Sequence, residues 1–209
     1  VTSIGLSMGL LALFMAVWGR PLEGAWLLLL CVLLDKLDGT VARLLNASSE
    51  LGVQLDSLSD FLTFCIAPAV VLLAMYRSPD GGFGQFPEVL FPVASLVTYV
   101  VAGALRLARF NCQAAEEDTP KHFFVGIPTT LCGGLLMALA LTLDRYHLVN
   151  QALPFLLAVP PVCAVLMMSH LFLPKLNKRR KFRAILWFQV LNLILVPVLV
   201  IKHWAPEYM

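Results

Sequence analysis

Charged side chains are scarce in this chain of 209 residues. Aspartate, glutamate, lysine and arginine make up 13% of it, whereas 59% of the residues are hydrophobic. A soluble globular domain carries about 25% charged residues. The composition therefore excludes an ordinary soluble domain and predicts an all-α polytopic membrane helix bundle. Neither the length nor an internal repeat divides the chain, so residues 1–209 are treated as a single domain.

Ligand patterns for soft metals are missing as well. The five cysteines form no C-x-x-C pair, and the four histidines are scattered along the chain. Zinc sites combine cysteine and histidine ligands at short, regular spacings. The sequence therefore predicts neither a zinc site nor a disulfide framework, and the cysteines are interpreted as small buried hydrophobic residues.

Long apolar runs are what the chain contains instead. A membrane-spanning helix needs about 20 predominantly apolar residues. The hydropathy pattern predicts about seven such helices, separated by turns rich in proline, glycine and charged residues. They are Thr2–Trp18, Leu22–Leu45, Leu51–Tyr76, Phe86–Phe110, Phe123–Leu143, Leu153–Leu173 and Ala184–Ile201.

The basic residues are shared unevenly between the two sides of such a bundle. Four fall on the side opposite the N-terminus, namely Arg20, Arg77, Arg145 and Lys202. Ten fall on the side of the N-terminus, namely Arg43, Arg106, Arg109, Lys121, Lys175, Lys178, Arg179, Arg180, Lys181 and Arg183. By the positive-inside rule, the side of the N-terminus is predicted to be cytoplasmic.

Charged residues gather in one stretch, residues 35–60. Asp35 and Asp38 are three apart, and Asp56 and Asp60 are four apart, so each pair shares one helical face. A charge at the centre of a bilayer costs roughly 2.5–3.5 kcal/mol, so these carboxylates need a compensating partner. Their oxygens suit a hard cation such as Mg²⁺ or Mn²⁺. Because the topology places all four near the same cytoplasmic face, the stretch predicts one divalent-cation site.

The residues between the aspartates point to phosphoryl transfer. Gly39 and Gly52 allow close approach of a second helix or of a ligand. Arg43 lies one to two helical turns beyond Asp38 and is suited to hold a phosphate. Divalent metals in such sites neutralise a diphosphate and clamp an in-line displacement. One carboxylate could then take the proton of a hydroxyl nucleophile.

This stretch resembles the CDP-alcohol phosphotransferases. It fits the pattern D-x2-D-G-x2-A-R-x8-G-x3-D-x3-D without a gap, at Asp35, Asp38, Gly39, Ala42, Arg43, Gly52, Asp56 and Asp60. The resemblance implies a membrane enzyme with a six-helix catalytic core. It further implies cleavage of the diphosphate of a CDP-linked lipid, transfer of the phosphatidyl group to an alcohol, and release of CMP.

The resemblance also assigns roles by position. It implies that two divalent ions, Mg²⁺ or Mn²⁺, are held by Asp35, Asp38, Asp56 and Asp60, and that Asp60 is also the general base. The residues implied to contact the CDP-lipid are Thr2, Ser3, Gly39, Ala42, Arg43 and Ser49.

Two later stretches resemble the membrane-embedded phosphatidylserine synthases within that family. They are Ala104–Asn111, which reads ALRLARFN, and Phe124–Thr129, which reads FVGIPT. This resemblance implies CDP-diacylglycerol and L-serine as substrates, membrane lipid as surroundings, a homodimer, no nucleic-acid partner, and a bacterial inner (cytoplasmic) membrane location. One departure is that Thr129 and Thr130 stand where a second proline is typical of that group.

The acceptor alcohol is tied to the first of these stretches. The carboxylate of serine needs a cationic partner, and Arg106 and Arg109, three apart on one helix, supply two candidates beside Asn111. Both arginines could instead be anchors that extend to the headgroups. Inositol phosphate, glycerol phosphate and choline are alternative acceptors for the same chemistry.

Two interpretations from other classes stay open. A divalent-cation transporter would also carry carboxylates inside the membrane, although it gives no reason for the glycine, alanine and arginine between them. The second interpretation is an inactive family member that serves as an assembly partner. The intact set of aspartates argues against it.

Overall fold

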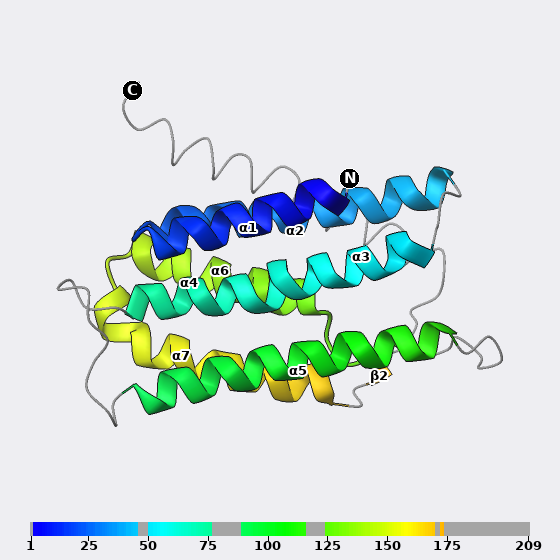
Figure 1. The fold of residues 1–209 in the computed structure, drawn as a ribbon. Helices are drawn as coiled ribbons and strands as arrows, with labels where there is room; N and C mark the ends of the chain where they lie inside the picture. Colours follow the sequence, from blue (N-terminus) through cyan, green and yellow to red (C-terminus); the bar gives the residue numbers. More distant parts are fainter. Residues whose placement is uncertain (1, 46–49, 77–88, 116–123, 170–171, 174–209) are drawn as a thin grey trace, which may run out of the picture.

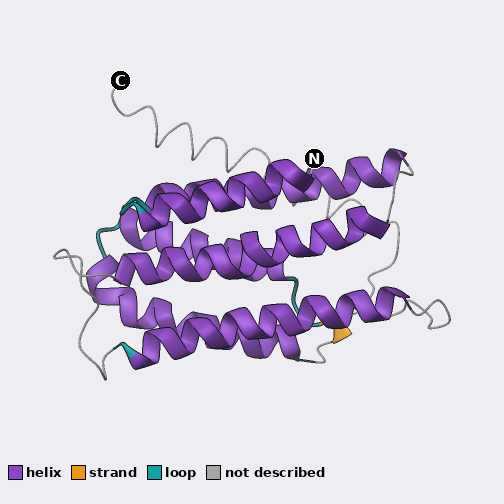
Figure 2. Ribbon diagram, in the orientation of Figure 1, coloured by secondary structure: helices purple, strands orange, loops and turns teal. Residues whose placement is uncertain are grey.

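The computed structural model describes residues 2–45, 50–76, 89–115, 124–169 and 172–173. Helices account for nearly all of this part, which confirms the all-α prediction (Figure 2). They are α1 Thr2–Val17, α2 Pro21–Leu45, α3 Glu50–Phe61, the π-helical segment η1 Leu62–Ile66, α4 Ala67–Tyr76, α5 Leu90–Ala115, α6 Thr129–Arg145 and α7 Val149–Met168.

The helices run along a common long axis (Figure 1). Helix α1 packs on α2, α5 packs on α7, and α6 packs on both α2 and α7. The C-terminal ends of α2 and α5 and the N-terminal end of α3 extend beyond the other helices at one end of the bundle (Figure 1).

The outward surface of the bundle is apolar along much of its length. Phe14 on α1, Phe91 and Val97 on α5 and Phe155 on α7 are all at least half exposed. Soluble monomers rarely expose apolar patches of this extent. Within the described residues, Leu51–Tyr76 and Leu90–Cys112 are long and apolar enough to cross a membrane. The surface and these two segments fit a bundle surrounded by lipid.

Two predicted spans need correction. The fifth was predicted to begin at Phe123, but α6 begins only at Thr129, because residues 124–125 form the short strand β1, Phe124–Val125. The sixth was predicted as Leu153–Leu173, but α7 ends at Met168. Residues 172–173 form the strand β2, Phe172–Leu173, which pairs antiparallel with β1.

Gly126 explains why the helix cannot start earlier. Its φ of 78° lies in the left-handed region that favours glycine. A Cβ added there would collide with the carbonyl oxygen of Met167 at the end of α7. The backbone N–H of Ile127 donates to the carbonyl of Leu166 at 3.3 Å, which continues this contact. The predicted seventh span, Ala184–Ile201, lies outside the described residues.

The third predicted span is one continuous helical segment with a π-helical turn in its middle. Pro68 has no backbone N–H, so the carbonyl of Phe64, four residues earlier, loses its ordinary helical donor. The backbone N–H of Ala67 bonds instead to the carbonyl of Leu62, five residues earlier. The hydroxyl of Tyr99 on α5 donates to the carbonyl oxygen of Phe64 at 2.6 Å. Because a buried carbonyl without a partner costs about 1–3 kcal/mol, this bond supports η1.

Small residues let three other helices approach η1 closely. A Cβ added to Gly133 on α6 would lie 2.8 Å from the carbonyl oxygen of Phe64. A Cβ added to Gly103 on α5 would collide with the sulfur of Cys65, and one added to Gly9 on α1 would collide with the hydroxyl of Thr63. The π-helical turn is thus held from α1, α5 and α6.

We expect Gly133→Ala to lower the melting temperature in detergent, because the new methyl group meets a backbone that cannot move freely. Overpacking of this kind costs about 1–3 kcal/mol. The matched control is Gly134→Ala on the same helix, where the new Cβ would meet only the side chain of Val32, whose Cγ2 lies at 3.3 Å. Equal melting temperatures for the two variants would contradict the close packing of α6 on η1.

Candidate metal and substrate site

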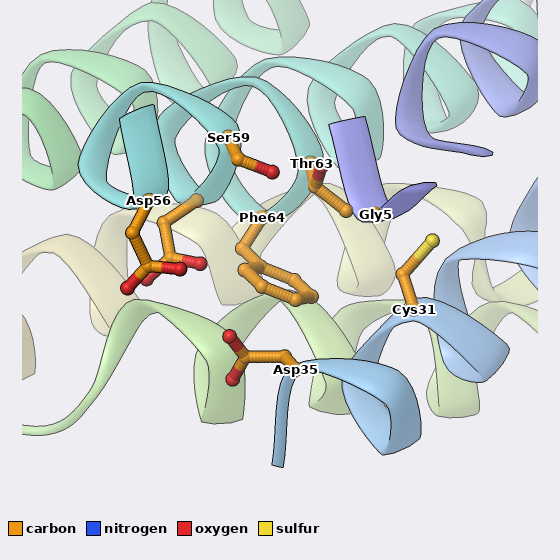
Figure 3. Close-up of a pocket in the computed structure, with 8 residues that line it drawn as sticks. Gly5, Cys31, Asp35, Asp56, Ser59, Thr63 and Phe64 are labelled. Carbon is orange, nitrogen blue, oxygen red and sulfur yellow. The ribbon is translucent and has the colours of Figure 1, made fainter. Parts of the chain in front are cut away.

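Three carboxylates from two helices converge beside the N-terminal part of α1. Asp35 lies on α2, and Asp56 and Asp60 lie one helical turn apart on α3. One carboxylate oxygen of each lies within 4.8 Å of the others. Figure 3 shows Asp35 and Asp56 approaching the same space from opposite sides. Of the four aspartates predicted to share one site, the structure thus brings Asp35, Asp56 and Asp60 together.

A small pocket lies directly beside the carboxylates (Figure 3). Its volume is about 20 Å³, which suffices for one or two species of the size of a water molecule. Helices α1, α2 and α3 and the segment η1 all contribute to its wall. The lining residues are Gly5, Cys31, Asp35, Asp56, Ser59, Asp60, Thr63 and Phe64.

Burial increases from one end of this pocket to the other. Asp56 is exposed, and Asp35 and Asp60 are partly buried. Ser59 is 7% exposed and Thr63 only 2%. The hydroxyl oxygen of Thr63 is buried and makes no hydrogen bond within the described part of the chain. The pocket therefore opens beside Asp56 and closes at Thr63.

The donor set fits a divalent cation. Carboxylate oxygens at this separation suit hard ions such as Mg²⁺ and Mn²⁺, which prefer oxygen ligands. At an effective dielectric of about 20, two carboxylates 4.8 Å apart repel by roughly 3 kcal/mol. A bound cation would replace that repulsion with attraction, so Asp35, Asp56 and Asp60 are the described residues that could hold one.

Arg106 supplies positive charge from the side of α5. It is partly buried, and its charge and that of Asp60 interact. Its Nε atom is buried and has no hydrogen-bond partner among the residues that the structure describes. Arg109, by contrast, is exposed. The structure thus distinguishes the two arginines that were predicted as partners of the serine carboxylate, because Arg106 is partly buried and Arg109 is exposed.

Asn111 connects α5 to α3. The hydroxyl of Ser57 donates to the Oδ1 atom of Asn111 at 3.1 Å, and Asn111 is partly buried. Ser57 directly follows Asp56 in the chain. Asn111 therefore lies beside the site, where it supports the first turns of α3.

The remaining predicted site residues are less fully described. Ser3 is exposed and is absent from the pocket wall, where Gly5 contributes instead. Its carbonyl accepts a hydrogen bond from the hydroxyl of Ser7 at 2.8 Å. Ser49 lies outside the described residues. The same holds for the side chains of Thr2, Asp38, Ala42 and Arg43, and Gly39 is described only as part of the backbone of α2.

Sequence reasoning missed the deeper half of the pocket, formed by Cys31, Ser59, Thr63 and Phe64. The sequence contained the signal, because Ser59, Asp60 and Thr63 lie three, four and seven residues after Asp56 and so share its helical face. Cys31 lies one turn before Asp35 on the same basis. Extending both acidic faces by one turn would have found these residues.

Comparison with known proteins agrees with this site. The profile of the family described as CDP-alcohol phosphatidyltransferase matches residues 1–196. The chain belongs to this family. As a CDP-alcohol phosphatidyltransferase it is a transferase of phospholipid biosynthesis, and the family uses divalent metal ions.

Relatives from bacteria and yeast carry one name, CDP-diacylglycerol–serine O-phosphatidyltransferase. The Helicobacter pylori protein (strain 26695) is 31% identical over 178 residues, covering 85% of this chain and 71% of the relative. The Bacillus subtilis protein is 30% identical over 174 residues, covering 81% and 85%. The Saccharomyces cerevisiae protein is 37% identical over 133 residues, covering 61% and 44%.

Removing one carboxylate should weaken metal binding without unfolding the bundle. We expect Asp56→Asn to raise the dissociation constant for Mn²⁺ by about tenfold or more, since a neutral amide replaces a charged ligand. Electron paramagnetic resonance of free Mn²⁺ would measure it. The control is Asp144→Asn in the last turn of α6, outside the pocket, which should bind Mn²⁺ like the unmodified protein. Equal affinities for all three proteins would contradict the metal site.

Proposed function

We propose that this chain transfers the phosphatidyl group of CDP-diacylglycerol to L-serine, giving phosphatidylserine and CMP. The observation that carries the proposal is the cluster of Asp35, Asp56 and Asp60 inside the family match. The name shared by relatives that cover most of this chain supports serine as the acceptor. We propose further that the chain forms about seven transmembrane helices, with a six-helix catalytic core among them.

Four aspartates, Asp35, Asp38, Asp56 and Asp60, would hold two divalent ions, Mg²⁺ or Mn²⁺. When bound, such ions supply positive charge that neutralises the diphosphate of the substrate. The CDP-lipid would be bound by Thr2, Ser3, Gly39, Ala42, Arg43 and Ser49, as the family resemblance implies.

Asp60 would act as the general base. It takes the proton of the serine hydroxyl, whose oxygen forms a bond to the phosphorus on the lipid side. The bond from that phosphorus to the oxygen of CMP breaks, and CMP leaves with the electron pair. The position of Asp60 on the pocket wall beside two other carboxylates supports this role.

Arg106, Arg109 and Asn111 would bind the acceptor. The carboxylate of serine calls for a cationic hydrogen-bond donor, and guanidinium groups bind carboxylates well. Arg106 is the strongest of the three candidates. Its Nε has no hydrogen-bond partner among the described residues, and its positive charge interacts with the charge of Asp60. Arg109, which is exposed, would meet serine or lipid headgroups at the entrance.

The proposed setting is the bacterial inner membrane. The uneven distribution of lysine and arginine supports a site that faces the cytoplasm, and the apolar outer surface of the bundle supports lipid as its surroundings. We propose a homodimer, as the resemblance implies. Water-soluble serine and CMP would then exchange with the cytoplasm, while both lipids stay in the bilayer.

The first test is CMP release by the purified protein with CDP-diacylglycerol and Mn²⁺ or Mg²⁺. L-serine, inositol phosphate, glycerol phosphate and choline would be offered in separate reactions. We expect release that depends on serine alone. Release with a different alcohol would keep the phosphatidyl transfer and replace the acceptor. Flux of Mn²⁺ into liposomes without any CMP would instead support the transport alternative.

Replacing the base should abolish turnover while leaving the fold intact. We expect Asp60→Asn to lower kcat by about 100-fold or more, the usual scale of general base catalysis. Asp144→Asn is the matched control, with the same chemical change outside the pocket. Near-normal turnover of purified, metal-loaded Asp60→Asn would show that another group takes the proton.

A further inference from the structure

The π-helical segment η1 begins two residues after Asp60 and connects the site to the core of the bundle. On one side of it, α3 carries Asp56 and Asp60. On the other side, α4 is fixed in the core by Val71 and Leu72, neither of which is exposed. Any change in the geometry of η1 must therefore appear as a movement of α3 relative to α4.

The direction of that movement follows from helix geometry. Each residue of an α-helix turns by about 100°, since a turn contains about 3.6 residues. A π-helical turn accommodates one extra residue in the same segment. If η1 became α-helical while α4 stayed packed, α3 would rotate by about 100°. Asp56 and Asp60 would then turn away from Asp35.

The hydrogen bond from Tyr99 opposes this rotation. Its hydroxyl donates to the carbonyl of Phe64, which Pro68 cannot serve. Tyr99 has no exposed surface, so water cannot replace its hydroxyl as the donor to the carbonyl of Phe64. The same turn places the buried hydroxyl of Thr63 on the pocket wall, close to Gly9 of α1.

We propose that Tyr99 is a positioning residue, whose hydrogen bond to the carbonyl of Phe64 holds η1 in the geometry that aims Asp56 and Asp60 at Asp35. Tyr99 touches neither metal nor substrate and acts only through the backbone of η1. The activity measurements that test this proposal rest on the proposed function, whereas the metal-binding measurements do not.

The decisive comparison is Tyr99→Phe with Ser95→Ala. Ser95 lies one turn earlier on α5, and its hydroxyl also makes a buried bond to a backbone carbonyl, that of Leu157 on α7. Each variant loses one buried hydrogen bond from α5, but only Tyr99→Phe loses a bond to η1. A merely structural role predicts the same effects from both.

We expect Tyr99→Phe to weaken Mn²⁺ binding, and to lower kcat at saturating serine, by about tenfold, a usual effect of removing a residue that orients metal ligands. Ser95→Ala should leave the Mn²⁺ affinity and kcat close to those of the unmodified protein, because the hydroxyl of Ser95 bonds to α7 and not to η1. Equal Mn²⁺ affinities for the two variants would overturn the proposal. If the unmodified protein released no CMP, the proposed function would fail, while the Mn²⁺ comparison would still decide the role of Tyr99.

A double variant covers the case in which Tyr99→Phe folds poorly. Pro68→Ala restores a backbone N–H four residues after Phe64, so in the Tyr99→Phe background this N–H can replace the lost bond to the carbonyl of Phe64. We expect the double variant to recover the melting temperature but not the Mn²⁺ affinity, because an α-helical bond now replaces the π-helical geometry. Recovery of both would show that η1 geometry does not set the metal site.

Discussion

Mutual repulsion of carboxylates is the constraint on which the rest of the structure depends. Asp35, Asp56 and Asp60 are held within 4.8 Å of one another in a chain that is otherwise mostly apolar. Such a cluster persists only where the surrounding bundle is stable enough to hold it and where positive charge is at hand. Arg106 provides part of that charge from α5, and the oxygen-rich donor set provides a place for divalent ions.

The scaffold meets this demand through backbone contacts around η1. Pro68 removes one helical hydrogen bond, Tyr99 replaces it from α5, and glycines on α1, α5 and α6 allow those helices to approach closely. Bonds and contacts of this kind fix the orientation of a helix more tightly than apolar side chains alone, since they have one geometry rather than several. This is the basis of the proposed role of Tyr99, since the acidic face of α3 continues directly into η1.

The sequence was sufficient to predict the parts of the fold in which residues of one kind form long runs or recur at helical spacing. The apolar runs predicted the helices, and the spacing of Asp35, Asp56 and Asp60 predicted a shared site. It was insufficient where local preference and tertiary contact disagree. Phe124 and Val125 read as helix because they are apolar, yet Gly126 and pairing with β2 make them a strand. Arg106 and Arg109 read alike in the sequence, and only the folded structure distinguishes the partly buried arginine from the exposed one.

The graded burial of the pocket has a consequence for how the two substrates meet. Asp56 at its mouth is exposed, whereas Ser59 and Thr63 at its base are buried between α1 and α3. In the proposed reaction, water-soluble molecules would reach the carboxylates from the side of the exposed Asp56. The lipid substrate would arrive through the apolar flank, since its acyl chains cannot cross a charged mouth. The carboxylates would then stand where these two routes intersect.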